Sequence, residues 1–353
     1  MSLNTTERDQ RIREQQIREP WIREQVLRGI SANRTPGYHF PNHFLEIWFG
    51  EVSNTRAQLG FDPGPHCLDN HGEVHIGALA LLADLAMSAS IRHRLHPAAR
   101  LGTVSFQLHL TGAPSDGPLE SSGVFQGFIE GAAGRQGISQ VSVHSDGRMV
   151  AFGGASFMAL DPPKNVTLHP VTMRRRGDQR ATLPAPESLT ADELAIVARS
   201  DRALDEARAE GGAFADYFWG RPIAIESTLE STAESTAEST VESTLESAIG
   251  SGEGVALLPN GLYASNRVGH MQGGLLAGFA VHTADQILVH RSGKPWRFAA
   301  LSVAYVSPGE GAELRAVAHV IHHGGLTALV RTQIIRPDGR IAIEATTQHT
   351  ARA

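Results

Sequence analysis

The spacing of apolar residues predicts the same succession of elements twice in this chain. Two mostly apolar stretches, at 78–95 and 275–291, are each long enough for a helix of several turns. The first is apolar nearly all round and rich in alanine, which is typical of a helix enclosed by other elements. Residues 104–110 alternate between apolar and polar side chains, as a strand with one buried face does. We therefore expect central helices wrapped by strands.

A glycine-containing loop precedes each apolar stretch, and a turn sequence follows each set of strands. Gly72 and Gly269 occupy the same place in the two loops. The turns read Ser-Asp-Gly-Arg at 145–148 and Pro-Asp-Gly-Arg at 337–340. Asp-Gly between alternating apolar residues is a strong signal for a β-hairpin. Agreement over this length indicates an internal duplication.

The duplication predicts two domains of the α+β class, each with a long central helix wrapped by a curved antiparallel sheet. We place a charged N-terminal tail at 1–36, the first domain at 37–161, a linker with a helix at 162–212 and the second domain at 213–353. The second domain contains a low-complexity Glu-Ser-Thr insertion at 226–247. We expect this insertion to be disordered or a poorly held helix without chemistry of its own.

Three segments outside the duplicated pattern support separate predictions. In the tail, Ile-Arg-Glu recurs at a spacing that fits neither helix nor strand, and Pro20 interrupts it, so we expect a solvated, partly helical segment. The run Arg174–Arg176 in the linker is either solvated or a contact for a ligand phosphate. Thr190 and Glu193 have the spacing of a capping box, so a helix should begin there and end near Gly211.

Composition narrows the class of protein without identifying its chemistry. The 353 residues are 41% hydrophobic and 19% charged, and the chain has neither a run long enough to span a bilayer nor an apolar signal segment, so we expect a cytoplasmic protein. The net charge of −6 equals the charge of the six glutamates of 226–246, so the rest of the chain is neutral and indicates neither nucleic acid nor a membrane as partner.

Cys67 is the only cysteine, which excludes internal disulfides and cysteine-based zinc sites. We expect it to be a half-buried structural thiol rather than a nucleophile.

The loop and helix motifs resemble those of the hotdog-fold thioesterases, specifically the PaaI-like branch. The mark of that branch is Asn-x-x-Gly-x-x-His-Gly-Gly followed by an Asp on the helix. In the first copy, His75 matches the family His and Asp84 follows nine residues later, where the family places its carboxylate. This copy has Asp69 at the Asn position and Ile76 at the first Gly of the pair. The resemblance covers about 40–160 and, more weakly, 215–353.

The second copy departs from the motif at different positions. It keeps Asn266, Gly273 and Gly274, but Gln272 replaces the His and Val281 stands at the carboxylate position. Neither copy is complete alone. The resemblance implies that two hotdogs pair about a twofold axis, so that the loop of one copy faces the carboxylate of the other.

Two composite sites then follow, of which we expect only one to work. Nine residues of helix span about 13 Å, so Asp84 cannot meet a substrate held at the start of its own helix. The working site joins Asp84 to the second copy's loop, and the other lacks its carboxylate. The residues of the working site are Asp84, Asn266, Gln272 and Gly273, and those of the second, inactive site are Asp69, His75, Ile76 and Val281.

The chemistry that this resemblance implies is hydrolysis of an acyl-CoA-type thioester. The free amide of Gly273 at a helix start would bond the thioester oxygen as negative charge develops, and Gln272 would add a donor or orient the thioester. Asp84 would act as general base for water or as nucleophile through an anhydride, and sequence does not choose between them. Ser88, one turn after Asp84, is our first candidate for holding the water, and Thr103 is a weaker one.

Each of these residues also has a purely structural interpretation. Burying a carboxylate in an apolar helix costs free energy, so we expect Asp84 to have a role. That role is either catalytic or the capping of a neighbouring loop. Gln272 and Gly273 would otherwise only shape a tight turn, and His75 is better explained as a structural remnant. Asp285 shares a helix face with Val281, but a solvated or capping role explains it better than rescue of the second site. The remaining histidines lack metal-ligand spacing, so we assign no metal and no cofactor beyond the CoA of the substrate.

Other functions remain open at this stage. The main alternative is a non-catalytic hotdog module that binds acyl-CoA or a protein partner. A hydratase would need an Asp and His pair near the helix, and no convincing version of that pattern is present. We expect acyl-CoA as substrate and a homodimer of double hotdogs, while the acyl group and the choice between CoA and acyl-carrier protein stay undetermined.

Overall fold

The computed structural model of the chain describes residues 5–37, 39–96, 99–130, 135–161, 164, 167–220 and 254–352. The prediction for the Glu-Ser-Thr insertion at 226–247 lies outside these residues. Within the described part of the chain, no helix combines the length and the apolar character that crossing a bilayer requires.

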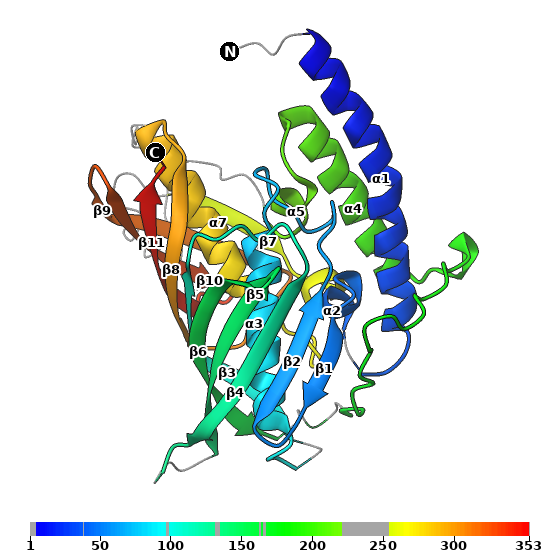
Figure 1. Cartoon of the computed structure of the whole chain (residues 1–353), viewed down its shortest axis with the longest axis vertical. Coiled ribbons are helices and arrows are strands. Elements are labelled where there is room, and N and C mark those ends of the chain that lie inside the picture. The colour runs from blue at the N-terminus through cyan, green and yellow to red at the C-terminus, as the bar shows by residue number, and fades with distance from the viewer. Residues whose placement is uncertain are drawn as a thin grey trace, which may run out of the picture.

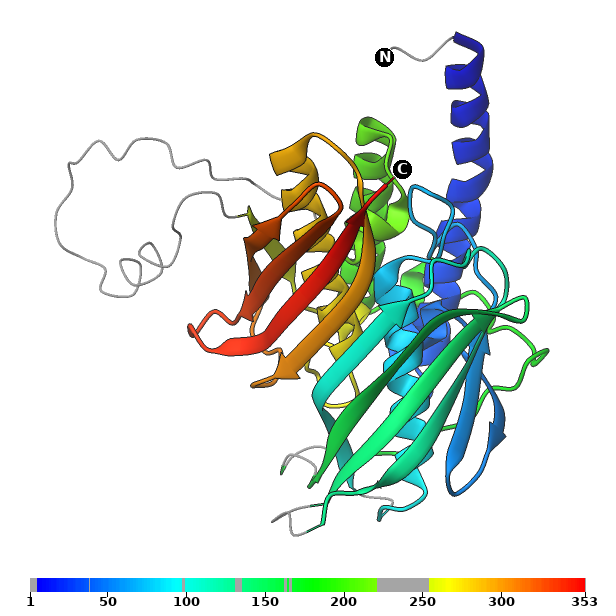
Figure 2. The same cartoon turned by 60° about the vertical axis from the view of Figure 1, so that its left-hand side comes forward.

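Strands from both halves of the described chain form one antiparallel sheet (Figures 1 and 2). Its order is β1 (Trp48–Val52), β2 (Arg56–Phe61), β4 (Leu119–Phe128), β5 (Gln136–Ser145), β6 (Arg148–Leu160), β3 (Arg100–Leu110), β8 (Trp296–Tyr305), β11 (Ile341–Ala351), β10 (Thr327–Ile335), β9 (Glu313–His323) and β7 (Gly254–Pro259). The halves join where β3 pairs with β8, with Gln107 opposite Ser302. Outward from this junction, β3, β6, β5, β4 and β2 correspond in order to β8, β11, β10, β9 and β7, as the duplication predicts, and β1 follows only in the first half of the described chain.

Two long helices, α3 (Ile76–Arg92) and α7 (Gly273–Ser292), pack against each other and against the strands of their own halves. Glycines allow the close crossing. A Cβ added at Gly278 would lie 2.4 Å from the Cα of Gly77, and one at Gly274 would lie 2.5 Å from the Cα of Leu81. The prediction of enclosed helices is confirmed, because the side chains along most of both helices are buried. This crossing holds the start of each helix against the middle of the other.

The two predicted hairpins are present. Asp146 and Gly147 both have positive φ angles, 48° and 76°, between β5 and β6. Two adjacent positive φ values are the mark of the turn type that Asp-Gly favours. The second turn connects β10 to β11 and contains Gly339 with a φ of 80°.

The N-terminal segment forms a helix against the body of the protein, so the prediction of a solvated tail is wrong for its second half. Helix α1 (Thr5–Asn33) continues through Pro20 and buries Ile22, Val26 and Ile30. These three residues recur every fourth position and form one helix face, which the dense Arg-Glu pattern obscures. Figure 1 shows α1 beside α4 (Ala191–Glu210).

Helix α4 begins and ends as predicted. Thr190 and Glu193 form both hydrogen bonds of the capping box, and Gly211 ends the helix with a φ of 70°. Short segments complete the fold: the helices α2 (Phe40–Phe44) and α5 (Phe214–Phe218) and the 3-10 turns η1 (Pro186–Ser188) and η2 (Leu262–Ala264). The aromatic rings of α2, α5 and η2 pack together, with Phe44 and Phe218 centred 5.2 Å apart.

The linker lies along the edge strand β1. Arg174 donates to the carbonyl oxygen of Glu46, Arg175 donates to that of Gly50, and Arg176 pairs with the carboxylate of Asp62. The arginine run therefore attaches the linker to the first half of the chain. This attachment places residues 168–171 and Met173 in the wall of a cavity of about 740 Å³.

Candidate active site

The carboxylate of Asp84 receives hydrogen bonds from both halves of the chain. Thr103 Oγ1, on β3, donates to Asp84 Oδ1 over 3.0 Å. Gln272 Nε2, at the start of α7, donates to Asp84 Oδ2 over 3.0 Å. The predicted meeting of Asp84 with the second copy's loop is confirmed. Each carboxylate oxygen has about two acceptor positions, so one on each remains for a further donor.

Burial determines the protonation of this carboxylate. Asp84 is 5% exposed. Loss of water raises the pKa of Asp84 to about 6, although the hydrogen bonds from Thr103 and Gln272 pull it down. The carboxylate is therefore ionised at neutral pH, and its pKa is close enough to neutral pH for it to accept a proton during the reaction. Both properties suit a general base.

Helix α7 presents its positive end to Asp84. Gln272 caps the helix: its side-chain oxygen accepts from the amides of Gly274 and Leu275, which leaves its NH₂ group for Asp84. The amide of Gly273 is the first of the helix and so has no acceptor within it. A Cβ at Gly273 would lie 3.3–3.4 Å from Tyr305 and Thr103. A side chain at this position would therefore crowd Thr103 and Tyr305, in the wall of a cavity that Asp84 also lines.

Tyr305 is a part of the site that the sequence did not reveal. Its hydroxyl donates to the carbonyl oxygen of Gly273 over 2.7 Å. Burial and the nearby charge of Asp84 raise the pKa of Tyr305, so the ring stays neutral and fixes the loop. Tyr305 lies at the end of β8, and only the pairing of β3 with β8 brings it near Thr103.

The two candidate hydroxyls for the water differ in their contacts. Thr103 donates to Asp84, whereas Ser88 Oγ donates to the carbonyl oxygen of Leu85 in its own helix, so the structure favours Thr103. A serine one turn on shares a helix face, but its hydroxyl readily bonds back to the helix. A break in the β3–β6 register between Thr103 and Ser105 accompanies the inward position of Thr103.

Asn266 shapes the loop rather than reaching toward Asp84. Its side-chain oxygen accepts from the amides of Val268 and His270. The corresponding oxygen of Asp69 accepts from His71 and Glu73 in the first half. The two side chains therefore stabilise their loops with equivalent hydrogen bonds, and Asp69 can make the same bonds as Asn266.

A cavity of about 740 Å³ opens beside Asp84. Its wall combines both halves with the linker, and many of its residues are apolar: Phe49, Leu85, Leu101, Phe157, Leu168, Val171, Met173 and Leu276. Arg92, Arg100 and Arg267 also line it. The space suits a ligand with an apolar part and an anionic part.

Comparison with known proteins identifies the fold. No protein-family model and no curated protein sequence matches the chain. A solved structure from Novosphingobium aromaticivorans, provisionally described as a thioesterase, is 13% identical, with a TM-score of 0.51 over 86% of this chain and 98% of that one. Another, from Lactobacillus plantarum and provisionally described as an oleoyl thioesterase, is 10% identical, with a TM-score of 0.50 over the same shares. The chain has the hotdog fold.

Within this hotdog fold, the second composite site differs from the first at each key position. Val281 is fully buried where Asp84 stands in the first site, and Ile76 replaces Gly273. The register centred on the Gln107–Ser302 pair puts Phe298 at the position of Thr103. The second site therefore has no carboxylate at the position of Asp84, no hydroxyl at that of Thr103, and a branched side chain at that of Gly273.

A second cavity of about 590 Å³ nevertheless lies there. His75 caps α3 as Gln272 caps α7, with its Nδ1 accepting from the amide of Gly77 over 3.1 Å. Burial lowers the pKa of His75 to about 3, so the ring is neutral. Asp285 contacts His349 over 2.8 Å, so it neither stays fully solvated nor restores the position of Val281.

Cys67 is fully buried rather than half-buried. Its thiol contacts the carbonyl oxygen of Gly64. Burial raises the pKa of the Cys67 thiol to about 12, so the thiol is not a nucleophile at neutral pH.

Proposed function

We propose that the chain is an acyl-CoA thioesterase of PaaI-like ancestry, built as a double hotdog with one composite active site. The observation that supports this most directly is the shared hydrogen bonding of Asp84 by Thr103 and Gln272 beside a large, partly apolar cavity. The proposal needs both halves, because Asp84 and Thr103 come from the first and Gln272 and Gly273 from the second.

We assign Asp84 the role of general base. Both of its oxygens accept hydrogen bonds, which orients the carboxylate and leaves room for a water. Asp84 takes a proton from this water as the water oxygen bonds to the thioester carbon. The C–S bond then breaks, and the leaving thiolate takes the proton from Asp84, giving a carboxylic acid and free CoA thiol.

The start of α7 supplies the electrostatic part of the reaction. The Gly273 amide points along the helix dipole and stabilises the negative charge on the thioester oxygen in the transition state. Donors of this kind contribute about 3 kcal/mol each to the barrier. The absence of a side chain at Gly273 lets the acyl carbonyl approach this amide.

The apolar wall would hold the acyl chain, and the arginines of the cavity would face the phosphates of CoA. The substrate panel that tests this contains acyl-CoAs from short to long and aromatic, with thiol release as the signal and acyl-carrier-protein thioesters as a parallel series. We expect hydrolysis of at least one acyl-CoA class. Tight binding of every acyl-CoA without thiol release would instead support a non-catalytic binding module.

The choice between general base and nucleophile has its own test. The protein is mixed with substrate and the reaction is quenched within one turnover. The mass of the protein is then measured by mass spectrometry. A general base leaves the protein mass unchanged. An increase equal to the acyl group on the peptide that contains Asp84 would show an anhydride instead.

A further inference from the structure

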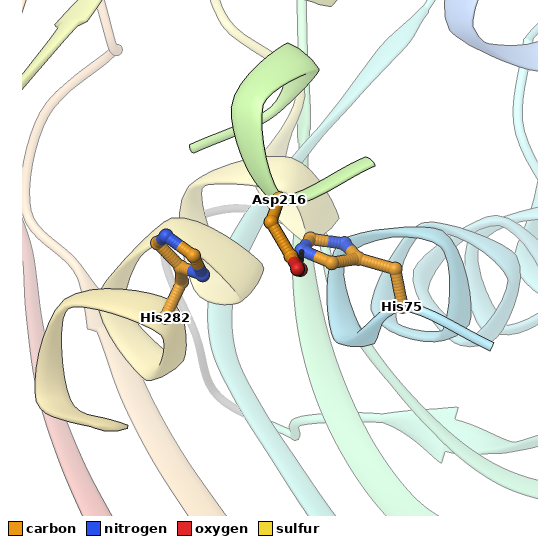
Figure 3. A group of neighbouring side chains, drawn as sticks. All are labelled: His75, Asp216 and His282. Carbon is orange, nitrogen blue, oxygen red and sulfur yellow. Dashed lines mark ion pairs between the residues drawn. The ribbon is translucent and has the colours of Figure 1, made fainter. Parts of the chain in front are cut away.

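Three side chains from distant parts of the chain converge in the second cavity. His75 lies at the start of α3, Asp216 on α5 and His282 on α7 (Figure 3). One nitrogen or oxygen of each lies within 4.8 Å of the others. We propose that His75, Asp216 and His282 bind one zinc ion. The residues are far apart in sequence, so the spacing argument that predicted no metal could not detect them.

The approach of His75 to Asp216 suits a small metal ion, while the ligand atom of His282 lies within 4.8 Å of both and has to move closer. His75 Nε2 and Asp216 Oδ1 are 3.6 Å apart. Two ligands at about 2.0–2.1 Å from a tetrahedral zinc lie roughly 3.4 Å from each other. A shift of a few tenths of an ångström therefore brings this pair to zinc-binding distance. Two imidazoles and a carboxylate are a common ligand set for zinc.

The nitrogen that would bind the metal is buried without a hydrogen-bond partner. His75 is 3% exposed, and its Nε2 has no hydrogen-bond acceptor or donor in range. Asp216 Oδ1 lies 3.6 Å from this nitrogen, beyond hydrogen-bond distance. A buried polar atom without a partner is costly, so its position demands a ligand.

The charges around Asp216 favour a cation. Asp69 and Asp285 both act on Asp216 through repulsion. All three carboxylates line the second cavity. A divalent ion at Asp216 would turn these repulsions into attraction in a site of reduced dielectric constant.

Two contacts oppose the metal. Nε2 of His282 hydrogen-bonds to Nε2 of Gln286, so a metal either takes the other ring nitrogen of His282 or displaces this contact. Nδ1 of His75 accepts from Gly77, so in the metal-free ring the proton sits on Nε2. Zinc binding moves that proton to Nδ1 and removes the hydrogen bond to Gly77. In exchange for this hydrogen bond the metal gains three protein ligands.

Three protein ligands leave one position of a tetrahedral zinc open. His75, Asp216 and His282 all line the second cavity, so that position faces a space of about 590 Å³. The second site of the duplication would thus have exchanged the carboxylate chemistry of the first for a metal.

Calorimetry of the untagged, chelator-treated full chain with zinc tests this proposal. We expect one zinc per chain and, with cobalt(II) as substitute, the visible absorption of a tetrahedral complex. His75→Gln keeps a helix cap, because Gln272 caps α7 in the same way, and removes the ligand. His75→Gln and Asp216→Asn should each weaken zinc binding by more than about 100-fold, beyond the 10–100-fold of a supporting contact.

Two control variants separate this site from general binding and from the thioesterase proposal. His71→Gln, on the same cavity but outside the cluster, should bind zinc like the wild type. Asp84→Asn should also bind it, whatever the outcome for hydrolysis. Absence of one-to-one binding by the wild type, or unchanged binding by folded His75→Gln, would overturn the proposal.

Discussion

Gln272 Nε2 and Asp84 Oδ2 lie 3.0 Å apart although 188 positions separate the two residues along the chain. The contact exists because α3 and α7 cross closely enough for the cap of one helix to reach the middle of the other. Gly278 permits that crossing, because a Cβ there would lie only 2.4 Å from the Cα of Gly77. The geometry of the site therefore depends on glycines that take no part in the chemistry.

Gly278→Ala should destabilise the protein by about 1–3 kcal/mol, the usual cost of forcing a methyl group into a packed core. The added Cβ would lie 2.4 Å from backbone, which cannot move aside as a flexible side chain can. Urea unfolding measures the loss. Gly325→Ala is the matched control, because nothing lies within 4 Å of a Cβ there. Equal stability of the two variants would contradict the close crossing.

The pH dependence of kcat/KM should follow the ionisation of Asp84. Burial raises the pKa of Asp84 to about 6, and only the ionised form accepts a proton from water. We expect kcat/KM to rise with pH through about 6 and to level off above it. A profile that is flat between pH 5 and 8 would exclude this carboxylate as the base.

Thr103→Val should lower turnover by about 10–100-fold and move the rise in kcat/KM to higher pH. The substitution keeps the side-chain shape but removes a hydrogen bond that stabilises the Asp84 carboxylate. Ser88→Ala is the control, because the Ser88 hydroxyl donates to the carbonyl oxygen of Leu85 in its own helix. If Ser88→Ala has the larger effect, the hydroxyl that serves the site is misassigned.

Asp84→Asn should stabilise the fold at pH 8. Because the pKa of Asp84 rises from 3.8 to about 6 on folding, the folded chain binds this proton more tightly, and stability falls as pH rises from about 4 to 6. Above that range the charge costs about 2–3 kcal/mol at 1.36 kcal/mol per pKa unit. Asparagine should recover about 1–2 kcal/mol at pH 8 and almost nothing at pH 4. A less stable variant at pH 8 would contradict this burial cost.

The two composite sites should respond differently to substitution. Gly273→Val places a branched side chain against Tyr305 and Thr103 and should abolish turnover. Val281→Ala should leave turnover nearly unchanged, at a stability cost of about 1–2 kcal/mol for a buried valine. Steady-state kinetics with a thermal melt for each variant measures both. Loss of turnover in Val281→Ala would show that the working site is misplaced.

The sequence predicted the fold well because local patterns repeat. Alternating residues at 104–110, the Asp-Gly turns and the cap at Thr190 each specify their own element, and all three predictions are confirmed. The contact of Asp84 with Gln272 was predictable because the two motif copies are defective in complementary ways.

Other parts of the site depend on packing between distant segments. Tyr305 reaches Gly273 only through the β3–β8 junction. Asp216, on α5, lies near His75 at the start of α3 although the two residues are far apart in sequence. Neither contact has a local signature. The tail was expected to be partly helical, but the burial of its helix was missed because three apolar residues, spaced by four, stand among many charged ones.

The most direct measurement is thioester turnover by wild-type protein and by Asp84→Asn, at pH 8, with the best substrate of the acyl-CoA panel. Calorimetry with a non-hydrolysable analogue establishes that both proteins bind it equally. The account predicts that Asp84→Asn retains binding and loses turnover by about 100- to 10,000-fold, the contribution of a general base. Equal turnover by the two proteins would contradict it.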